Sequence, residues 1–277
     1  MLLRGFVIAL LALAPAAGTA APKAPAPVRI AYTYADLADL ALASPVAAHV
    51  RIREAIPVKE GSAAAAGHAR YYVEADIVTL VRGPAGFPAG VRYLADVPNA
   101  ADAAQKIRTK SDYLILAAPV RGRPGELQLA HKDAHIPWSP EMEARVRALL
   151  TEAAAPDAAP AIVGVGKAFH VAGTLPGESE TQLFLQTADG RPISLNVLRR
   201  PGQPPRWAVA LGEIVDEAAE PPKPDSLLWY RLACGLPAAL PAESLADSDA
   251  GSADAIRADY AMVLQGLGAC ARNRPRG

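Results

Sequence analysis

The sequence is poor in the residues that build reactive or strongly charged sites. Only two cysteines, Cys234 and Cys270, occur among its 277 residues, and they do not form a Cys-x-x-Cys pair. This excludes a thioredoxin-type redox motif. Basic and acidic residues number 28 each, so the chain has no excess of positive charge with which to bind a phosphate backbone. We therefore expect no nucleic-acid partner.

The chain also lacks cofactor signatures and a second long apolar run. It contains no glycine-rich phosphate loop, no Rossmann fingerprint and no internal repeat, so we expect no cofactor. After residue 20, no stretch is apolar for long enough to span a bilayer. We therefore expect no membrane insertion of the mature protein.

The strongest signal that is present lies in the first twenty residues. Arg4 precedes an apolar run, Phe6–Leu13, that is as long as the core of a signal peptide and too short to cross a membrane. Small residues precede Ala20, and we place cleavage directly after it. The sequence thus predicts a signal peptide over residues 1–20, a periplasmic or secreted location, and a flexible spacer over residues 21–31.

Export changes the expectation for the two cysteines. An even pair of cysteines in an exported protein favours a disulfide, so we predict a bridge between Cys234 and Cys270. The bridge would join the ends of two C-terminal helices and add roughly 3–4 kcal/mol of stability in the chain-entropy model. The alternative is two reduced, buried thiols.

Short strand signals dominate residues 32–153. Apolar and polar residues alternate over Arg70–Arg82, and the turn RGRPG predicts a hairpin between Asp112–Val120 and Glu126–Ala130. A helix is expected over Tyr34–Ser44, and a second begins with Ser139 as its N-cap. We predict a small antiparallel β-barrel with flanking helices. Further strands are expected over Val46–Val58 and Gly90–Val97.

Three segments, YADLADLALASPVAAHVRI, YYVEADIVTLVRG and SDYLILAAPV, carry a resemblance. In this order they resemble the OB-like, netrin-module-like barrels of secreted proteins, over roughly Tyr32 to Ala130. The resemblance implies an OB-like barrel. Members of that family bind proteases or other proteins through an N-terminal cysteine region, and this chain has no cysteine there.

After a linker over Ala154–Pro160, residues 161–277 are expected to form a β-meander followed by a C-terminal helical pair, which makes the whole chain α+β. This region resembles exported bacterial proteins to which no role is assigned. Trp207 is expected to anchor its core with Val209 and Leu211, and the final ARNRPRG to form a frayed tail. The expected elements are strands over Phe169–Ala172, Thr181–Thr187, Pro192–Leu198 and Arg206–Leu211, a polar loop over Glu243–Ser252, and helices over Leu227–Cys234 and Ala253–Cys270.

One turn of the meander fixes the register of its strands. A three-residue loop with Gly190 in the left-handed region places Leu185 opposite Ile193, whereas a two-residue loop would mix apolar and polar residues on both faces. The three-residue loop leaves a polar face with one aromatic residue, which could contact a carbohydrate or a peptide. The alternative is a solvated face. The predicted ligand-binding residues are Gln182, Phe184, Gln186 and Asn196.

Two other groups of residues are candidate chemical sites. Glu178, Glu180 and His170 could serve a cell-envelope hydrolase if their side chains converged in one pocket. His131 and His135 would share one face of a helix, as zinc ligands do, but the flanking residues are not helical, which favours two solvated loop histidines and no metal. We therefore predict a non-enzymatic binding or assembly module, with an envelope protein or a polysaccharide as its partner.

Overall fold

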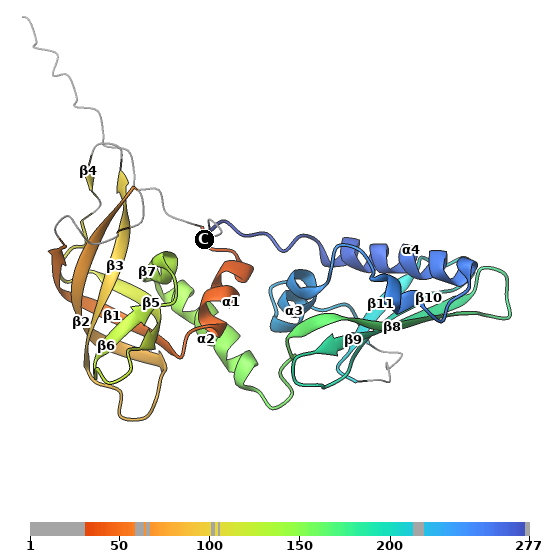
Figure 1. Cartoon of the computed structure of the whole chain (residues 1–277), viewed down its shortest axis with the longest axis horizontal. Helices are drawn as coiled ribbons and strands as arrows, with labels where there is room; N and C mark the ends of the chain where they lie inside the picture. Colours follow the sequence, from red (N-terminus) through yellow and green to blue (C-terminus); the bar gives the residue numbers. More distant parts are fainter. Residues whose placement is uncertain are drawn as a thin grey trace, which may run out of the picture.

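The computed structural model describes residues 31–58, 64, 67–100, 103–104, 106–212 and 219–274. The expected signal peptide (1–20) and all but the last residue of the spacer (21–31) lie outside the described residues. A β-barrel and a second sheet lie next to each other along the long axis of the molecule, with helices between them and on one side (Figure 1). The predicted α+β class is confirmed.

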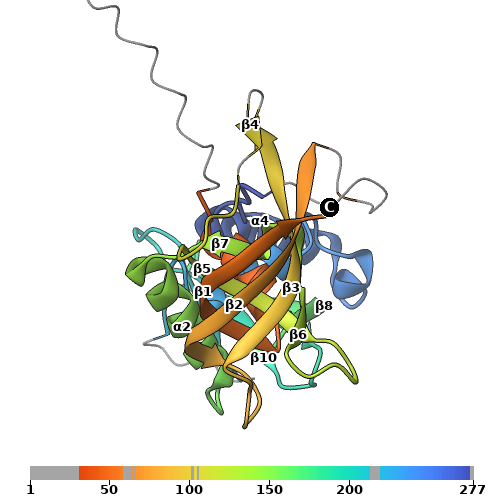
Figure 2. The ribbon, with the colours of Figure 1, turned by 90° about the vertical axis from the view of Figure 1, so that its left-hand side faces the viewer.

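Five strands close the barrel. β1 pairs with β2, β2 with β3, β3 with β6 and β6 with β5, and β5 returns to β1. Only the β3–β6 pair is parallel among these described pairs, and the result is an OB-like barrel. Figure 2 looks onto β1, β2, β3 and β6. The strands of this sheet are β1 (Val46–Pro57), β2 (His68–Arg82), β3 (Gly90–Ala100), β5 (Asp112–Pro119) and β6 (Glu126–Leu129), with β4 (Ala103–Ala104) and β7 (His135–Pro137) as short additions.

A bulge lets β1 continue past a charged residue. Glu54 interrupts the apolar alternation of Val50 and Ile52, and the pairing of β1 with β2 shifts in register between Ile52 and Glu54. A bulge inserts one extra residue and turns the following side chains to the other face. As a result, Val50 and Ile52 point into the barrel core while Glu54 is exposed.

Two helices cover the side of the barrel that faces the second sheet. α1 (Tyr34–Leu42) begins with a capping box between Thr33 and Asp36. α2 (Pro140–Ala154) begins, as predicted, with Ser139 as N-cap and Pro140 in the first turn. The 3-10 turn η1 (Lys132–Ala134) precedes β7. Leu37, Leu40, Leu114, Ile136 and Leu149 form the centre of this helix–barrel core.

The second sheet is an antiparallel meander in the order β11-β10-β9-β8. Its predicted register is confirmed, since Leu185 pairs with Ile193 and Leu183 with Leu195. Gly190 has φ +78°, the left-handed conformation that the three-residue loop requires. β8 begins earlier than predicted because two irregularities, at 162/164 and 165/168, hide its alternation. The strands are β8 (Ile162–Ala172), β9 (Ser179–Thr187), β10 (Ile193–Arg199) and β11 (Arg206–Ala210).

Helices cover one face of this sheet. α4 begins at Ala250 instead of residue 253 because Asp249 caps it, and the loop predicted over Glu243–Ser252 holds the end of η2 and the start of α4. Trp207 packs against this core as predicted, but Leu211 is 49% exposed and does not. The helices are α3 (Leu227–Gly235), η2 (Ala242–Leu245) and α4 (Ala250–Leu267).

The C-terminal segment after α4 is ordered against the barrel side of the molecule. The predicted disulfide is present between Cys234 and Cys270, with a Cα–Cα distance of 5.3 Å. Beyond it, residues 271–274, which we name the C-terminal strap, run back to α1 (Figure 1). The expectation of a frayed tail is therefore wrong for these residues, because aspartates of α1 hold their backbone and side chains.

Candidate functional site

A cleft lies on the outside of the barrel, across β2, β3 and β6. It has a volume of about 620 Å³, within the range of small-molecule sites. The loop between β5 and β6 and the η1 turn form its walls. Its apolar lining includes Tyr72 and Leu94, and its cationic lining consists of Arg70, Arg92, Arg123 and Lys132.

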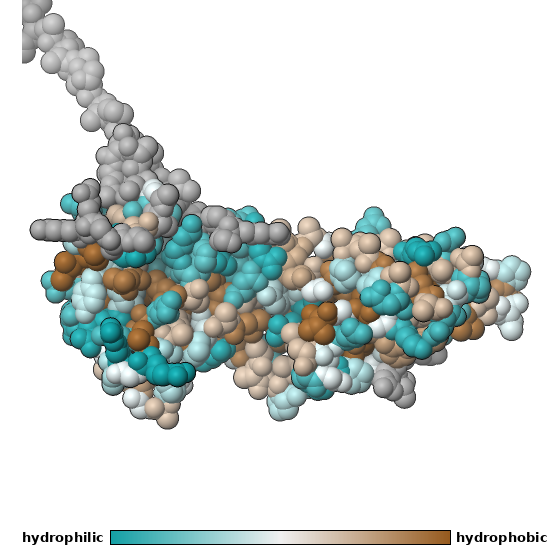
Figure 3. Space-filling view, viewed as in Figure 1, coloured by the Kyte–Doolittle hydropathy of each residue, from teal (hydrophilic) through white to brown (hydrophobic). Residues whose placement is uncertain are grey.

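Positive charge outweighs negative charge in this cleft. Four cationic side chains line it, together with two carboxylates, Asp96 and Glu126. Arg70 donates two hydrogen bonds to Asp96, at 2.6 and 2.7 Å, and these bonds raise the pKa of the guanidinium. Arg123 lies 3.2 Å from Glu126. Hydrophilic residues gather over this β6 side of the barrel, with isolated apolar ones among them (Figure 3).

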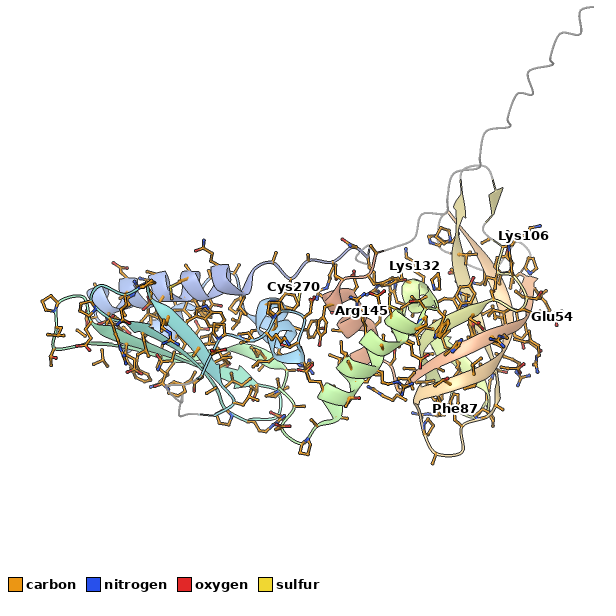
Figure 4. The ribbon with its side chains drawn as sticks, turned by 180° about the vertical axis from the view of Figure 1, so that it is seen from behind. Glu54, Phe87, Lys106, Lys132, Arg145 and Cys270 are labelled. Carbon is orange, nitrogen blue, oxygen red and sulfur yellow. A yellow bond between two sulfur atoms is a disulfide. The ribbon has the colours of Figure 1, made fainter. Side chains whose placement is uncertain are left out.

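Two of the cations remain available for a ligand. Neither Arg92 on β3 nor Lys132 on η1 forms an ion pair with any described residue. Figure 4 shows Lys132 on the side of the barrel that faces the helices. An anion bound between these two groups would form charge-assisted hydrogen bonds, which are about twice as strong as neutral ones.

The alternation of side chains along β2 and β3 places arginine and tyrosine side chains on the floor of the cleft. Tyr71 and Tyr93 point into the barrel core, so their neighbours Arg70, Tyr72 and Arg92 point outward. The loop between β5 and β6 lies close to the start of β3, and a side chain at Gly125 would meet the carbonyl oxygen of Gly90 at 3.2 Å. The site was missed at the sequence level because its residues come from three separate strands. The available signal was the outward set of β2 and β3, which includes Arg70 and Arg92.

A histidine lies directly behind the cleft, inside the barrel. Nε2 of His135 lies 3.1 Å from the Tyr93 hydroxyl, and its ring stacks on Tyr113 at 3.8 Å between centroids. Burial lowers the pKa of His135 to about 3, so the ring is neutral at physiological pH. The expectation of a solvated loop histidine is therefore wrong at this position.

The two histidines considered as zinc ligands lie in different environments. His131 caps η1, accepting a hydrogen bond from the backbone N–H of Asp133, while His135 is buried among tyrosines. Among the described residues, no three histidine, cysteine or acidic side chains are grouped as metal ligands. The spacing therefore does not translate into a shared helix face, because residues 131 and 135 flank a 3-10 turn.

The predicted ligand face lies on the side of the second sheet opposite α4. Phe184 and Gln186 line a groove of about 510 Å³, in which Phe184 meets the exposed Phe169 edge to face at 6.1 Å. Asn196 is only 8% exposed, and its amide donates to Glu180 at 2.6 Å. Gln182 is half-buried beside it. The structure thus brings the four residues onto one face, with Phe184 and Gln186 in the groove.

The three residues considered for a hydrolase do not converge. Glu180 accepts from Asn196 on the outer face of β9. His170 lies on the inner face, 2.8 Å from the Thr181 hydroxyl, which donates to the buried Asp259. Glu178 lies in the preceding loop and accepts from the backbone N–H of Leu175. Since acid, base and nucleophile must reach a common point, this geometry gives the hydrolase alternative no support.

Comparison of the sequence with protein-family models and with curated proteins finds no match. Across the described part of the chain, every helix is too short or too polar to cross a membrane.

Proposed function

We propose that the protein is an exported, non-enzymatic binding protein whose barrel cleft takes an acidic oligosaccharide. The observation that carries the proposal is the cation-rich cleft itself, in which Arg92 and Lys132 have no ion-pair partner among the described residues. The predicted signal peptide and the Cys234–Cys270 disulfide both support export.

The lining of the cleft favours a sugar that carries carboxylates. Tyr72 and Leu94 offer an apolar surface on which the C–H face of a sugar ring can pack. Beside them, the guanidinium of Arg92 can hold a carboxylate through paired N–H donors. The OB-fold itself supports this choice by analogy, since such barrels commonly bind oligosaccharides or oligonucleotides on the outer face of their second and third strands.

Calorimetry with a polyuronate hexasaccharide tests the proposal, with a neutral hexasaccharide of glucose as reference. We expect binding of the acidic sugar alone, weakening as salt rises because the contacts are ionic. Arg92→Gln with Lys132→Gln should reduce the affinity at least tenfold. Arg206→Gln, at an exposed arginine of β11 outside the cleft, is the matched control. Equal affinity for both sugars, or binding unaffected by the double substitution, would contradict the proposal.

The groove of the second sheet is a second candidate for a carbohydrate or peptide site. The observation in its favour is the aromatic pair Phe169 and Phe184, of which Phe169 is 45% exposed. Phe184→Ala should abolish binding at this face and leave the barrel cleft unaffected. Saturation transfer difference spectra of the two hexasaccharides are recorded on Phe184→Ala and on the double variant Arg92→Gln with Lys132→Gln. The variant that loses the signal of a sugar shows which face binds that sugar.

A further inference from the structure

The C-terminal strap connects the second sheet to the wall of the barrel cleft. It begins directly after Cys270, whose disulfide to Cys234 fixes it to the end of α3. Figure 4 shows Cys270 beside α3, with the chain continuing toward the helices of the barrel. The strap then contacts two aspartates of α1 and reaches the η1 turn.

Arg272 and the strap backbone bind α1 through its two aspartates. The guanidinium of Arg272 forms a bidentate pair with the carboxylate of Asp39. Its Nε donates to Oδ2 at 2.6 Å and its Nη2 donates to Oδ1 at 3.0 Å. Asp36 is fully buried and accepts the backbone N–H groups of Asn273, at 3.0 Å, and Arg274, at 3.2 Å. Charge-assisted bonds of this kind fix both ends of the contact, so the strap is held in one position.

From this position, Arg274 reaches the back of the cleft wall. Its Nε lies 3.6 Å from Oδ2 of Asp133, and both side chains are about nine-tenths buried. Asp133 is the central residue of η1, between Lys132 and Ala134. Its backbone carbonyl also accepts from the Tyr32 hydroxyl at 2.7 Å. The neighbours His131 and Lys132 line the cleft on the other side.

We propose that Arg274 is a positioning residue for the barrel cleft, holding η1 so that His131 and Lys132 face the ligand. The inference rests on the proposed function and places one support of that site in the second half of the chain. A 3-10 turn of three residues has weak internal hydrogen bonding, so its position depends on outside contacts. Removing Arg274 leaves the buried carboxylate of Asp133 with only the ring of His131, whose Nδ1 lies 3.0 Å from the same oxygen. The turn then loses its contact with the strap and relaxes toward solvent.

Two measurements on the full chain test the role of Arg274. The first is the affinity for the polyuronate hexasaccharide, which Arg274→Gln should weaken about tenfold, within the usual range of coupling between sites. The second is hydrogen exchange at residues 131–135, which should accelerate in Arg274→Gln and require no ligand. Arg274→Lys should recover part of the affinity and part of the protection from exchange, because lysine keeps the positive charge.

The control and the contrary outcomes separate the two proposals. Arg257→Gln removes an exposed arginine of α4 that pairs only locally with Asp254, and it should change neither readout. If the wild type does not bind the acidic sugar, the proposed function fails, while exchange still reports whether Arg274 holds η1. If the wild type binds and Arg274→Gln matches it in both affinity and exchange, the positioning role is wrong.

Discussion

A single buried histidine makes the stability of the barrel depend on pH. Burial holds the pKa of His135 at about 3 in the folded chain, against an ordinary value of 6.5. Between these values the unfolded chain binds more protons, so stability is complete above pH 6.5 and decreases as pH falls toward 3. The free energy of unfolding can fall by about 1.4 kcal/mol for each pH unit in this range. Urea unfolding at pH 7.5 and 4.5 measures it.

Substitution at the same position separates this effect from general acid unfolding. His135→Phe should be less stable than the wild type at pH 7.5, because the Tyr93 hydroxyl loses its partner. It should nevertheless lose less stability than the wild type on going to pH 4.5. Arg206→Gln, at an exposed arginine outside the barrel, serves as the control and should keep the wild-type pH dependence of stability. Parallel losses in His135→Phe and wild type would contradict the assignment.

At the scale of elements, α4 and β11 approach each other so closely that only glycine fits between them. A Cβ at Gly266 would lie 2.6 Å from Nε1 of Trp207 and 3.1 Å from a ring carbon. Because packed cores tolerate extra atoms poorly, Gly266→Ala should destabilise the protein by about 1–3 kcal/mol. The fluorescence-detected urea midpoint gives the change.

A glycine in the first turn of the same helix provides the control. A Cβ at Gly251 would meet only Oδ1 of Asp249, at an ordinary 3.4 Å. Gly251→Ala should therefore be neutral or stabilise by up to about 1 kcal/mol, because alanine favours a helix over glycine. If both substitutions had the same sign and size, the close contact between α4 and Trp207 would not control the packing.

Helices and strands were predictable from the sequence where an uninterrupted apolar pattern or a capping residue marks them. The β9–β10 register followed from the burial pattern because a slip of one residue would expose Leu183 and Leu185. The first half of β8 was missed because its irregularities break the alternation. The cleft could not be predicted either, since Arg92 and Lys132 line one cleft only after the barrel closure places β3 and η1.

At the scale of the whole molecule, the two halves are joined by contacts between residues far apart in sequence. Tyr230 of α3 donates to Asp39 of α1 at 2.7 Å, and Arg272 forks onto the same carboxylate. Although burial acts to raise the pKa of Asp39, these hydrogen bonds outweigh it and keep the pKa below its ordinary value. The carboxylate is therefore charged at neutral pH. Local sequence could not predict this docking, because the charges of the tail resemble those of any solvated end.

The disulfide joins α3 to the residue directly before the strap. Cys234→Ser with Cys270→Ser removes a link across 36 residues, which should cost about 3–4 kcal/mol by the chain-entropy estimate. The strap also loses its anchor next to Ala271, so Arg272 should leave Asp39 more often. We therefore expect a lower urea midpoint together with faster trypsin cleavage after Arg272, followed by mass spectrometry.

Reduction of the wild type distinguishes loss of the bond from damage by the substitutions. Wild type treated with dithiothreitol should match the double variant in both midpoint and cleavage rate, whereas the double variant should not respond to the reductant. A second double variant, Asp39→Asn with Tyr230→Phe, keeps the disulfide but weakens the strap contacts. It should accelerate cleavage after Arg272 with a smaller change in midpoint, because the loop-closure contribution of the disulfide remains. Cleavage at the wild-type rate in the reduced protein would mean that the aspartates of α1 hold the strap without the disulfide.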